Sequence, residues 1–211
     1  MTQAKQAMAP AKMDLYKLHK TEYAATRKPA LLTARKAQYL AIEGEGAPET
    51  DAFTESIGAL YGVAFTAKMT RKFSGKYDYV VCKLEAQWWC DGTQNFPAAP
   101  KEEWHWRLLI RTPDFVTPKD ADAAVAMLQK RGKAKGAERV RLESLSEGQC
   151  VQMLHLGPYE KECQTIEVMK KFAESKGLSF HGYHHEIYLS DPRRVAPEKL
   201  KTILRIPVAA D

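Results

Sequence analysis

Two similar stretches constrain the fold of this chain more than any other feature. RLLIRTP at residues 107–113 and KTILRIP at residues 201–207 match in residue type at most positions, and the short stretches KLEAQWW and HHEIYLS precede them. Each half of the chain also begins with a predicted strand followed by a predicted helix. We therefore predict an α+β fold of two duplicated strand-helix-strand-strand modules with antiparallel sheets. Chance similarity of short apolar strands is the alternative, because seven-residue matches are weak alone.

Periodicity and turn residues place the elements of both modules. In the first module, strands are expected at 34–46, 76–89 and 104–112 and a helix at 50–65. In the second, strands are expected at 148–159, 183–191 and 200–208 and a helix at 160–177. The modules span about 30–115 and 148–208, and a helix at 118–131 links them. Residues 1–29 are expected to form a flexible N-terminal tail, so that residues 30–208 form the domain.

Composition excludes several classes of protein. With 45% hydrophobic and 27% charged residues, the chain of 211 residues is neither disordered nor membrane-spanning. Its start lacks the apolar block of a secretory signal, and its four cysteines show no CxxC pair, so we expect a cytoplasmic protein with reduced thiols. The net charge of +6 is concentrated in KRGKAKGAERVR, which lacks interleaved aromatic residues. We expect neither direct nucleic-acid binding nor membrane association.

Alternation along the later strand of the second module suggests a site. Successive strand residues point to opposite faces of a sheet. We expect the helix to cover the face that carries His185, Ile187 and Leu189, which leaves on the open face His184, Glu186 and Tyr188. Glu186 would then lie on a sheet face that its helix does not cover.

The same pattern occurs in the first module. Its apolar face carries Cys82, Leu84, Ala86 and Trp88, so Glu85 and Trp89 fall on the opposite, open face. Two modules related by a pseudo-twofold axis would combine these open faces into one concave, central ligand cleft. An exposed sheet face with ordinary polar residues is the alternative for either strand alone.

No cofactor is predicted from the motifs. The chain has neither GxGxxG nor a Walker sequence, which argues against a nucleotide cofactor. His105, His184 and His185 form no ligand set with a neighbouring cysteine at helical or hairpin spacing, so we also expect no metal.

Several stretches resemble a known family. LHLGPYEK and HHEIYLSDPRRVAPEKLKTILRIPV are similar to the GyrI-like small-molecule-binding domain, which is shared with the effector-binding domains of multidrug-responsive transcription regulators. The resemblance covers roughly residues 30–208, and YLAIEGEG, GALYGVAF, LEAQWW and RTPDFVT look like a stand-alone bacterial branch. It implies a hydrophobic, often cation-accepting cleft in which the acid of the HEIYL strand binds the positive or polar group of the ligand. Only about thirty residues precede the first strand, too few for a DNA-binding domain, so transcription control by this chain alone is not expected.

The resemblance also implies a reaction. Some stand-alone members are cyclopropanoid cyclopropyl hydrolases, which open the strained ring of planar DNA-alkylating natural products by adding water. Such a site needs a base, a hydrogen-bond donor and aromatic walls. On these residues, the base would be Glu186 and the donor or water-positioning partner Tyr188. Five further residues would bind the ligand: Tyr39 and Trp89 as aromatic walls, Glu85 either as the acidic partner of Glu186 or as the group that binds a ligand cation, Tyr159 at the turn before the second helix, and His184.

Three functions remain open at this point. The first is a protein that binds or sequesters hydrophobic aromatic or cationic small molecules. The second is a cofactor-free hydrolase of reactive electrophiles, which requires an acid that holds water against a carbon atom. The third, a surface for a protein partner such as gyrase, is implied by the family name alone. Whether the two modules close on each other within a monomer or across a homodimer is also open.

Overall fold

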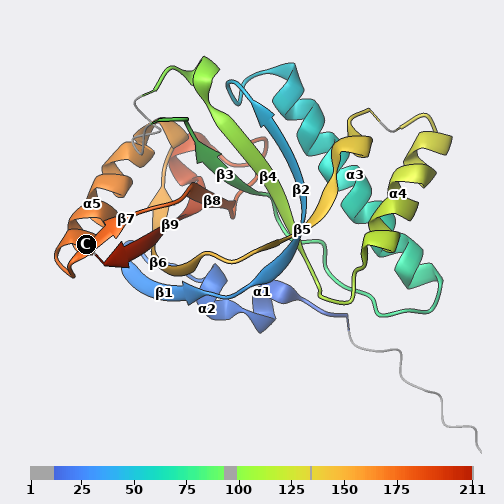
Figure 1. Ribbon diagram of the computed structural model, residues 1–211, viewed down its shortest axis with the longest axis horizontal. Helices are drawn as coiled ribbons and strands as arrows, with labels where there is room; N and C mark the ends of the chain where they lie inside the picture. The colour runs from blue at the N-terminus through green and yellow to red at the C-terminus, as the bar shows by residue number, and fades with distance from the viewer. Residues whose placement is uncertain (1–11, 93–98, 134, 211) are drawn as a thin grey trace, which may run out of the picture.

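The computed structural model describes residues 12–92, 99–133 and 135–210. They form an α+β fold with one nine-stranded antiparallel sheet, in which the order is β1-β6-β9-β8-β3-β4-β2-β5 and β7 pairs with β9 (Figure 1). The strands are β1 (Ala30–Ala34), β2 (Ala37–Glu45), β3 (Glu85–Trp89), β4 (His105–Thr112), β5 (Arg141–Leu145), β6 (Gly148–Leu156), β7 (Leu178–Phe180), β8 (His184–Tyr188) and β9 (Lys201–Ala210). The α-helices are α1 (Leu15–Leu18), α2 (Lys20–Tyr23), α3 (Asp51–Phe73), α4 (Pro118–Lys130) and α5 (Glu162–Glu174).

The two halves of the chain contribute strands in mirrored order. Strands β3, β4 and β2 of the first half lie in the order β3-β4-β2, and those of the second half lie in the order β8-β9-β6. The halves meet where β3 pairs antiparallel with β8 at the centre of the sheet. The elements β2, α3, β3 and β4 follow the predicted order, and so do β6, α5, β8 and β9, except that the short strand β7 lies between α5 and β8. Whether the two halves superpose as a duplication stays a prediction.

Local sequence signals define the helix starts. Thr117 caps α4 in a capping box with Asp120, and Pro118 is its first helical residue. Thr50 caps α3 without a capping box, by accepting a hydrogen bond from the backbone N–H of Phe53. Among the described residues, none of the helices has the length and apolar character that crossing a bilayer requires.

The strand expected at 76–89 is shorter than its composition suggests. Only residues Glu85–Trp89 pair in β3, whereas Tyr79 forms an isolated bridge with Met13. The backbone N–H of Val80 donates to the carbonyl of Met13 at 2.8 Å. The backbone at Tyr79 and Val80 therefore bridges to the N-terminal segment instead of continuing the ladder with β8, and the rings of Tyr77 and Tyr79 contact Phe115.

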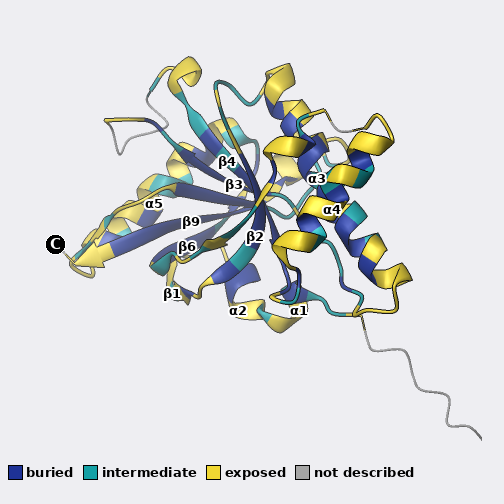
Figure 2. Ribbon diagram, turned by 45° about the vertical axis from the view of Figure 1, so that its right-hand side comes forward, coloured by how far each residue is buried: buried dark blue, intermediate teal, exposed yellow. Residues whose placement is uncertain are grey.

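Helices α3 and α5 cover the same face of the sheet. The strand registers align one row of side chains across this face: Ile42, Leu108, Ala86, Glu186, Leu204 and Met153. One end of the row packs in the core that includes α3, and the other end packs beneath α5. Figure 2 shows the central strands buried and the outer sides of the helices exposed. Glu186 is the sole ionisable side chain of this apolar row.

This placement corrects the expected orientation of β8. Glu186 pairs with Leu204, which packs beneath α5, so the helix covers the face of His184, Glu186 and Tyr188. His185 and Ile187, which we expected under the helix, lie on the opposite face. Alternation alone could not assign the faces, because both are buried: His184 to Ile187 are each less than 9% exposed.

The N-terminal segment covers the opposite face. Residues 1–11 lie outside the described residues, but 13–28 differ from the flexible tail that we expected, because they include α1 and α2 and pack on the sheet. Tyr23 donates a hydrogen bond to Glu85 at 3.0 Å, and the backbone N–H of Leu154 donates to Thr26 at 2.8 Å. The folded part of the chain therefore begins before residue 30, with a segment that seals the sheet.

A network of buried charges lies beneath this segment. The two nitrogens of the His185 ring lie 3.1 Å from Glu85 and 2.8 Å from Glu147. Arg205 contacts Glu147 at 3.1 Å and donates to the carbonyl of Glu22 at 2.6 Å. Burying a charge is costly unless it is paired, and here each charged group has a partner of opposite sign.

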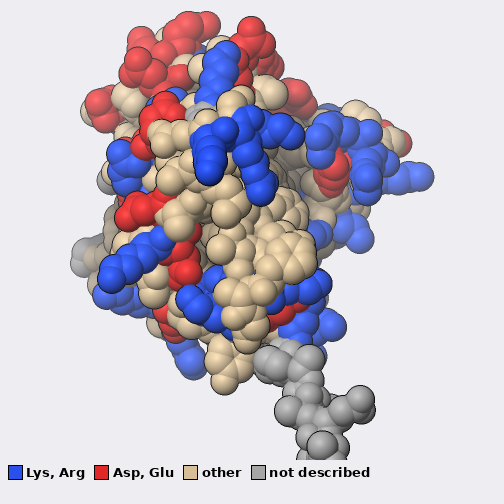
Figure 3. Space-filling view, turned by 90° about the vertical axis from the view of Figure 1, so that its right-hand side faces the viewer, with Lys and Arg blue, Asp and Glu red and all other residues tan. Residues whose placement is uncertain are grey.

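Outside the core, positive and negative charges are mixed. On the face in Figure 3, Lys and Arg side chains surround an uncharged area, and Asp and Glu gather at the upper end. Several of the basic residues of the KRGKAKGAERVR stretch bind acids or carbonyls of the chain itself: Lys135 pairs with Glu55, and Arg139 donates to the carbonyl of Glu43.

The His185 network predicts how stability depends on pH. Burial lowers the pKa of His185, but Glu147 and Glu85 outweigh it and raise the pKa from the ordinary 6.5 to about 9. A raised folded-state pKa contributes stability that is complete below pH 6.5 and is lost as the pH rises through about 9. His185→Gln should therefore reduce the free energy of unfolding by roughly 1–3 kcal/mol more at pH 6 than at pH 9.5.

Urea denaturation of both proteins across this pH range measures the effect. His181→Gln is the matched control, because His181 is exposed and lies outside the buried charge network. Parallel curves for wild type and His185→Gln would contradict a protonated His185 in the folded protein.

Candidate functional site

Four of the residues predicted for the site meet beneath the start of α5. His184, Glu186 and Tyr188 come from β8, and Tyr159 comes from the turn that precedes α5. Nε2 of His184 lies 3.1 Å from Oε1 of Glu186. The rings of Tyr159 and Tyr188 meet edge to face, with centroids 5.9 Å apart. We define these four residues together with Glu162 as the β8–α5 cluster.

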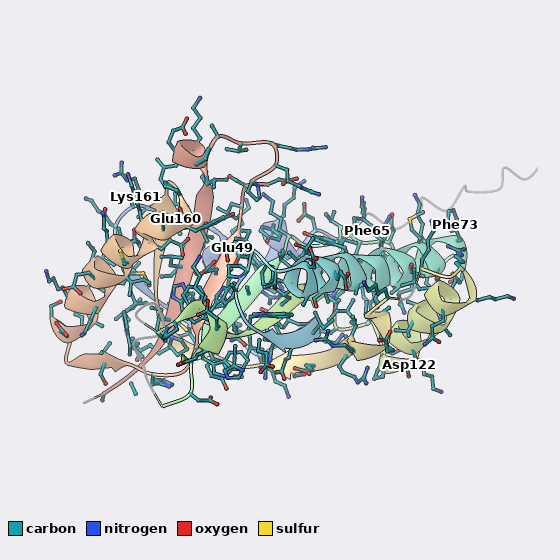
Figure 4. The ribbon with its side chains drawn as sticks, turned by 90° about the horizontal axis from the view of Figure 1, so that it is seen from above. Glu49, Phe65, Phe73, Asp122, Glu160 and Lys161 are labelled. Atoms are coloured by element: carbon teal, nitrogen blue, oxygen red, sulfur yellow. The ribbon has the colours of Figure 1, made fainter. Side chains whose placement is uncertain are left out.

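Glu162 is the member that our sequence reasoning missed. It lies in the first turn of α5, is 6% exposed, and has its Oε2 3.9 Å from Nε2 of His184. A signal for it was present, because Glu162 shares one helical stripe with Ile166, Met169 and Ala173, which pack on the sheet. An acid at a core position of a helix needs a buried partner. Figure 4 shows Glu160 and Lys161, just before it, at the end of α5 nearer to α3.

The cluster shifts the proton affinity of its members. Burial lowers the pKa of His184, but hydrogen bonds to Glu162 and Glu186 outweigh it and raise the pKa to about 9. Burial and the charge of Glu186 together raise the pKa of Glu162 to about 8. At neutral pH, these pKa shifts favour an imidazolium whose Nε2 faces both the protonated carboxyl group of Glu162 and the carboxyl group of Glu186.

Aromatic side chains surround these ionisable groups. Burial and the neighbouring Glu186 raise the pKa of Tyr188 well above its ordinary value, and a hydrogen bond from Trp88 acts in the opposite direction. Trp88 is the residue of β3 that lies directly opposite His184. Burial and Glu186 raise the pKa of Tyr159 to about 12. Both phenols therefore remain hydrogen-bond donors at neutral pH.

The structure does not bring the other three predicted residues to this cluster. Tyr39 and Glu85 lie on the opposite face of the sheet, and Tyr23 of the N-terminal segment covers Glu85. Trp89 also lies on that face, where its ring stacks on Tyr183 at 4.4 Å between centroids. Two carboxylates facing one cleft, as we expected for Glu85 and Glu186, are therefore not present, because the sheet separates them.

A shallow depression lies beside Trp89. Its volume is about 420 Å³, and its walls include Trp89, His105, Glu43 and Glu45. Glu43 is paired with Arg107, whose Nε donates to it at 2.6 Å. This depression has an aromatic wall, but one of its two acids, Glu43, is neutralised by Arg107, and no member of the β8–α5 cluster lines it. Convergent ionisable groups with shifted pKa values therefore favour the cluster as the chemical site.

The cluster also has the composition of a small metal site. Single donor atoms of Glu162, His184 and Glu186 all lie within 4.8 Å of one another, a spacing that a divalent ion could bridge. The same three groups also complete each other without an ion, because both carboxyl groups approach one nitrogen of the imidazolium, Nε2 of His184. The arrangement without a metal ion provides an acid and a base in one cluster.

Comparison with known proteins gives the family. The model of the GyrI-like small-molecule-binding domain matches residues 110–209. The chain is 37% identical to a conserved protein of Listeria innocua, over 94% of this chain and all of the other, with a TM-score of 0.88. The chain belongs to the GyrI-like small-molecule-binding family. This result confirms the resemblance seen in the sequence.

Two further structures extend the comparison. A protein from Listeria innocua described as a hydrolase is 36% identical over 94% of this chain and all of its own, with a TM-score of 0.84. The C-terminal domain of EcmrR shares 11% identity over 87% of this chain and 98% of its own, with a TM-score of 0.59, which shows a similar fold. No curated protein matches the chain.

The cluster predicts an unusually basic histidine. The imidazole of His184 should remain protonated up to about pH 9, and ¹⁵N-detected NMR titration measures this value directly. Glu186→Gln removes one of the two carboxyl partners and should lower the pKa of His184 by roughly 1–3 pH units. The exposed His181 provides the internal control in the same spectra. A His184 that titrates near 6.5 in the wild type would contradict the ion-paired cluster.

Proposed function

We propose that the protein binds planar hydrophobic molecules, cationic ones included, at the β8–α5 cluster and hydrolyses reactive ring systems there. The observation that carries the proposal is the position of Glu186. It is the sole ionisable residue in an apolar row at the centre of the sheet, and His184 and Tyr188 both contact it. Proteins retain such a costly group where chemistry or binding requires it. The relative from Listeria innocua that is described as a hydrolase supports turnover.

The proposed substrates are DNA-alkylating compounds that carry a cyclopropane conjugated to a dienone. In this reaction, Glu186 accepts a proton from water as the water oxygen bonds to the ring CH₂ group. The strained carbon–carbon bond breaks, and its electron pair moves into the dienone to form a phenolate, which takes up a proton from the solvent. Glu186 then releases to the solvent the proton that it took from water. Tyr188 holds Glu186 and the water in position, and His184 orients Glu186 by its hydrogen bond. Trp88 and Tyr159 form walls for the flat substrate.

A binding protein without turnover is the second candidate. The cluster contains two carboxyl groups and several aromatic rings, which together suit a cationic aromatic ligand. If Glu186 served only to bind cations, its removal would weaken binding of cationic ligands and leave neutral ligands unaffected. The neutral cyclopropane-bearing alkylator therefore separates the two functions, because only a hydrolase converts it to the water adduct.

Glu186→Gln tests the proposed base. The variant keeps the size and hydrogen-bonding capacity of the side chain but not its basicity. The rate of water-adduct formation, followed by mass spectrometry, should therefore fall by roughly 10²–10⁴-fold while the affinity changes little. Glu160→Gln is the matched control, because Glu160 is exposed just before α5. Full activity of Glu186→Gln would rule out the base assignment.

The two adjacent tryptophans test which face binds the ligand. Trp88 lies on the face of the cluster, whereas Trp89 lies on the opposite face against Tyr183. A bound flat aromatic ligand should quench tryptophan fluorescence in the wild type and in Trp89→Phe. Trp88→Phe should lose most of the quenching and bind more weakly, by roughly 1–3 kcal/mol. The reverse pattern would move the binding site to the face of Trp89.

A further inference from the structure

Glu162 has no role in the cyclopropane reaction described above. Its Oε1 is buried and makes no hydrogen bond to any of the described residues, and its Oε2 lies 3.9 Å from His184. A carboxyl group at such a buried position is costly to maintain when a hydrophobic residue would complete the helix stripe. Its position beside Glu186, at the same nitrogen of His184, suggests a second chemical role.

The proton count of the cluster defines that role. Glu162 and Glu186 cannot both be ionised at low cost, since like charges at short range disfavour each other. Burial and the charge of Glu186 raise the pKa of Glu162 to about 8, so at neutral pH Glu162 holds a proton. The cluster thus places a proton donor and a proton acceptor beside the same nitrogen of one imidazolium, with single donor atoms of the three residues within 4.8 Å of one another.

This short separation limits the substrates that can use both carboxyl groups. In a near-attack geometry, water lies about 3–3.5 Å from the carbon that it attacks, and an atom bonded to that carbon lies within about 5 Å of the water. The oxygen of a cyclopropane-bearing dienone lies across the ring from the attacked carbon and is out of reach. In an epoxide or aziridine, the leaving heteroatom is bonded directly to the attacked carbon.

We infer that Glu162 is the general acid of the site and that epoxides and aziridines with flat aromatic substituents are a further substrate class. The inference rests on the proposed function, because it uses Glu186 as the base. Water transfers a proton to Glu186 as its oxygen bonds to the ring carbon. The carbon–heteroatom bond breaks, and the heteroatom takes the electron pair and the proton of Glu162. Proton transfer from Glu186 back to Glu162 restores both groups, and the product is a diol or an amino alcohol.

Hydrolysis of styrene oxide in H₂¹⁸O provides the test, with the cyclopropane-bearing alkylator as the reference substrate. Wild type should form the diol with one ¹⁸O atom, and its rate should decline above about pH 8, where Glu162 loses its proton. Glu162→Gln should lower epoxide turnover by roughly 10²–10⁴-fold but slow opening of the cyclopropane by less than about tenfold. Glu162→Asp, which keeps an acid, should retain part of the epoxide activity, and Glu160→Gln should match wild type.

The outcomes separate the two proposals. If wild type opens the cyclopropane but not the epoxide, or if Glu162→Gln keeps its epoxide activity, the role of Glu162 is overturned and the proposed function stands. If wild type converts neither compound, both are overturned. Loss of epoxide turnover on treatment with EDTA, with recovery on addition of Zn²⁺, would assign Glu162, His184 and Glu186 to a metal ion and would also overturn the acid role. Circular dichroism confirms that each variant is folded.

Discussion

The antiparallel pairing of β3 with β8 at the centre of the sheet is the constraint on which the rest of the structure depends. Both faces of this pair are covered, so each ionisable side chain on it is removed from water and requires a partner. On one face His185 lies between two carboxyl groups, and on the other face two carboxyl groups approach Nε2 of His184. This requirement explains why α5 begins with an acid, why Glu147 stands just before β6, and why Tyr23 of the N-terminal segment reaches Glu85.

The two buried clusters differ in their balance of charge. On the face beneath α1 and α2, three acids face three basic groups: Glu22 pairs with Arg111, and the acids Glu85 and Glu147 contact His185 and Arg205. With His185 protonated, the three negative and three positive charges of that network cancel, so none of its acids has to hold a proton. This balance is typical of a structural network. Beneath α5, two acids share one imidazole. Neutrality there requires a proton on one carboxyl group, and a proton that can be given and taken back is what acid–base chemistry uses.

Local features of the fold could be predicted from the sequence, and long-range features could not. Thr117 and Pro118 define the start of α4 because capping depends on adjacent residues. The face of β8 could not be derived by alternation, because α5 buries one side and residues 13–28 bury the other, so His185 and Glu186 are equally hidden. Glu162 escaped notice for a related reason, since its partner lies 22 positions away in the sequence. The helical stripe marks Glu162 as buried, but neither its distant partner nor the covering segment leaves a local signal in the sequence.

Register explains why the chain has one β8–α5 cluster and no equivalent in its first half. Aligning RLLIRTP with KTILRIP equates Ile110 with Leu204, and Leu204 pairs with Glu186. Because Glu85 pairs with Leu109, the residue that faces Ile110 is Leu84, one position before Glu85. A shift of one residue moves a side chain to the other face of a sheet, so Glu85 is not the counterpart of Glu186. The first half carries a leucine at the corresponding position, and its helix α3 packs on an apolar surface there. Although the strand order of the two halves is mirrored, the acid–base chemistry that we propose therefore belongs to the second half alone.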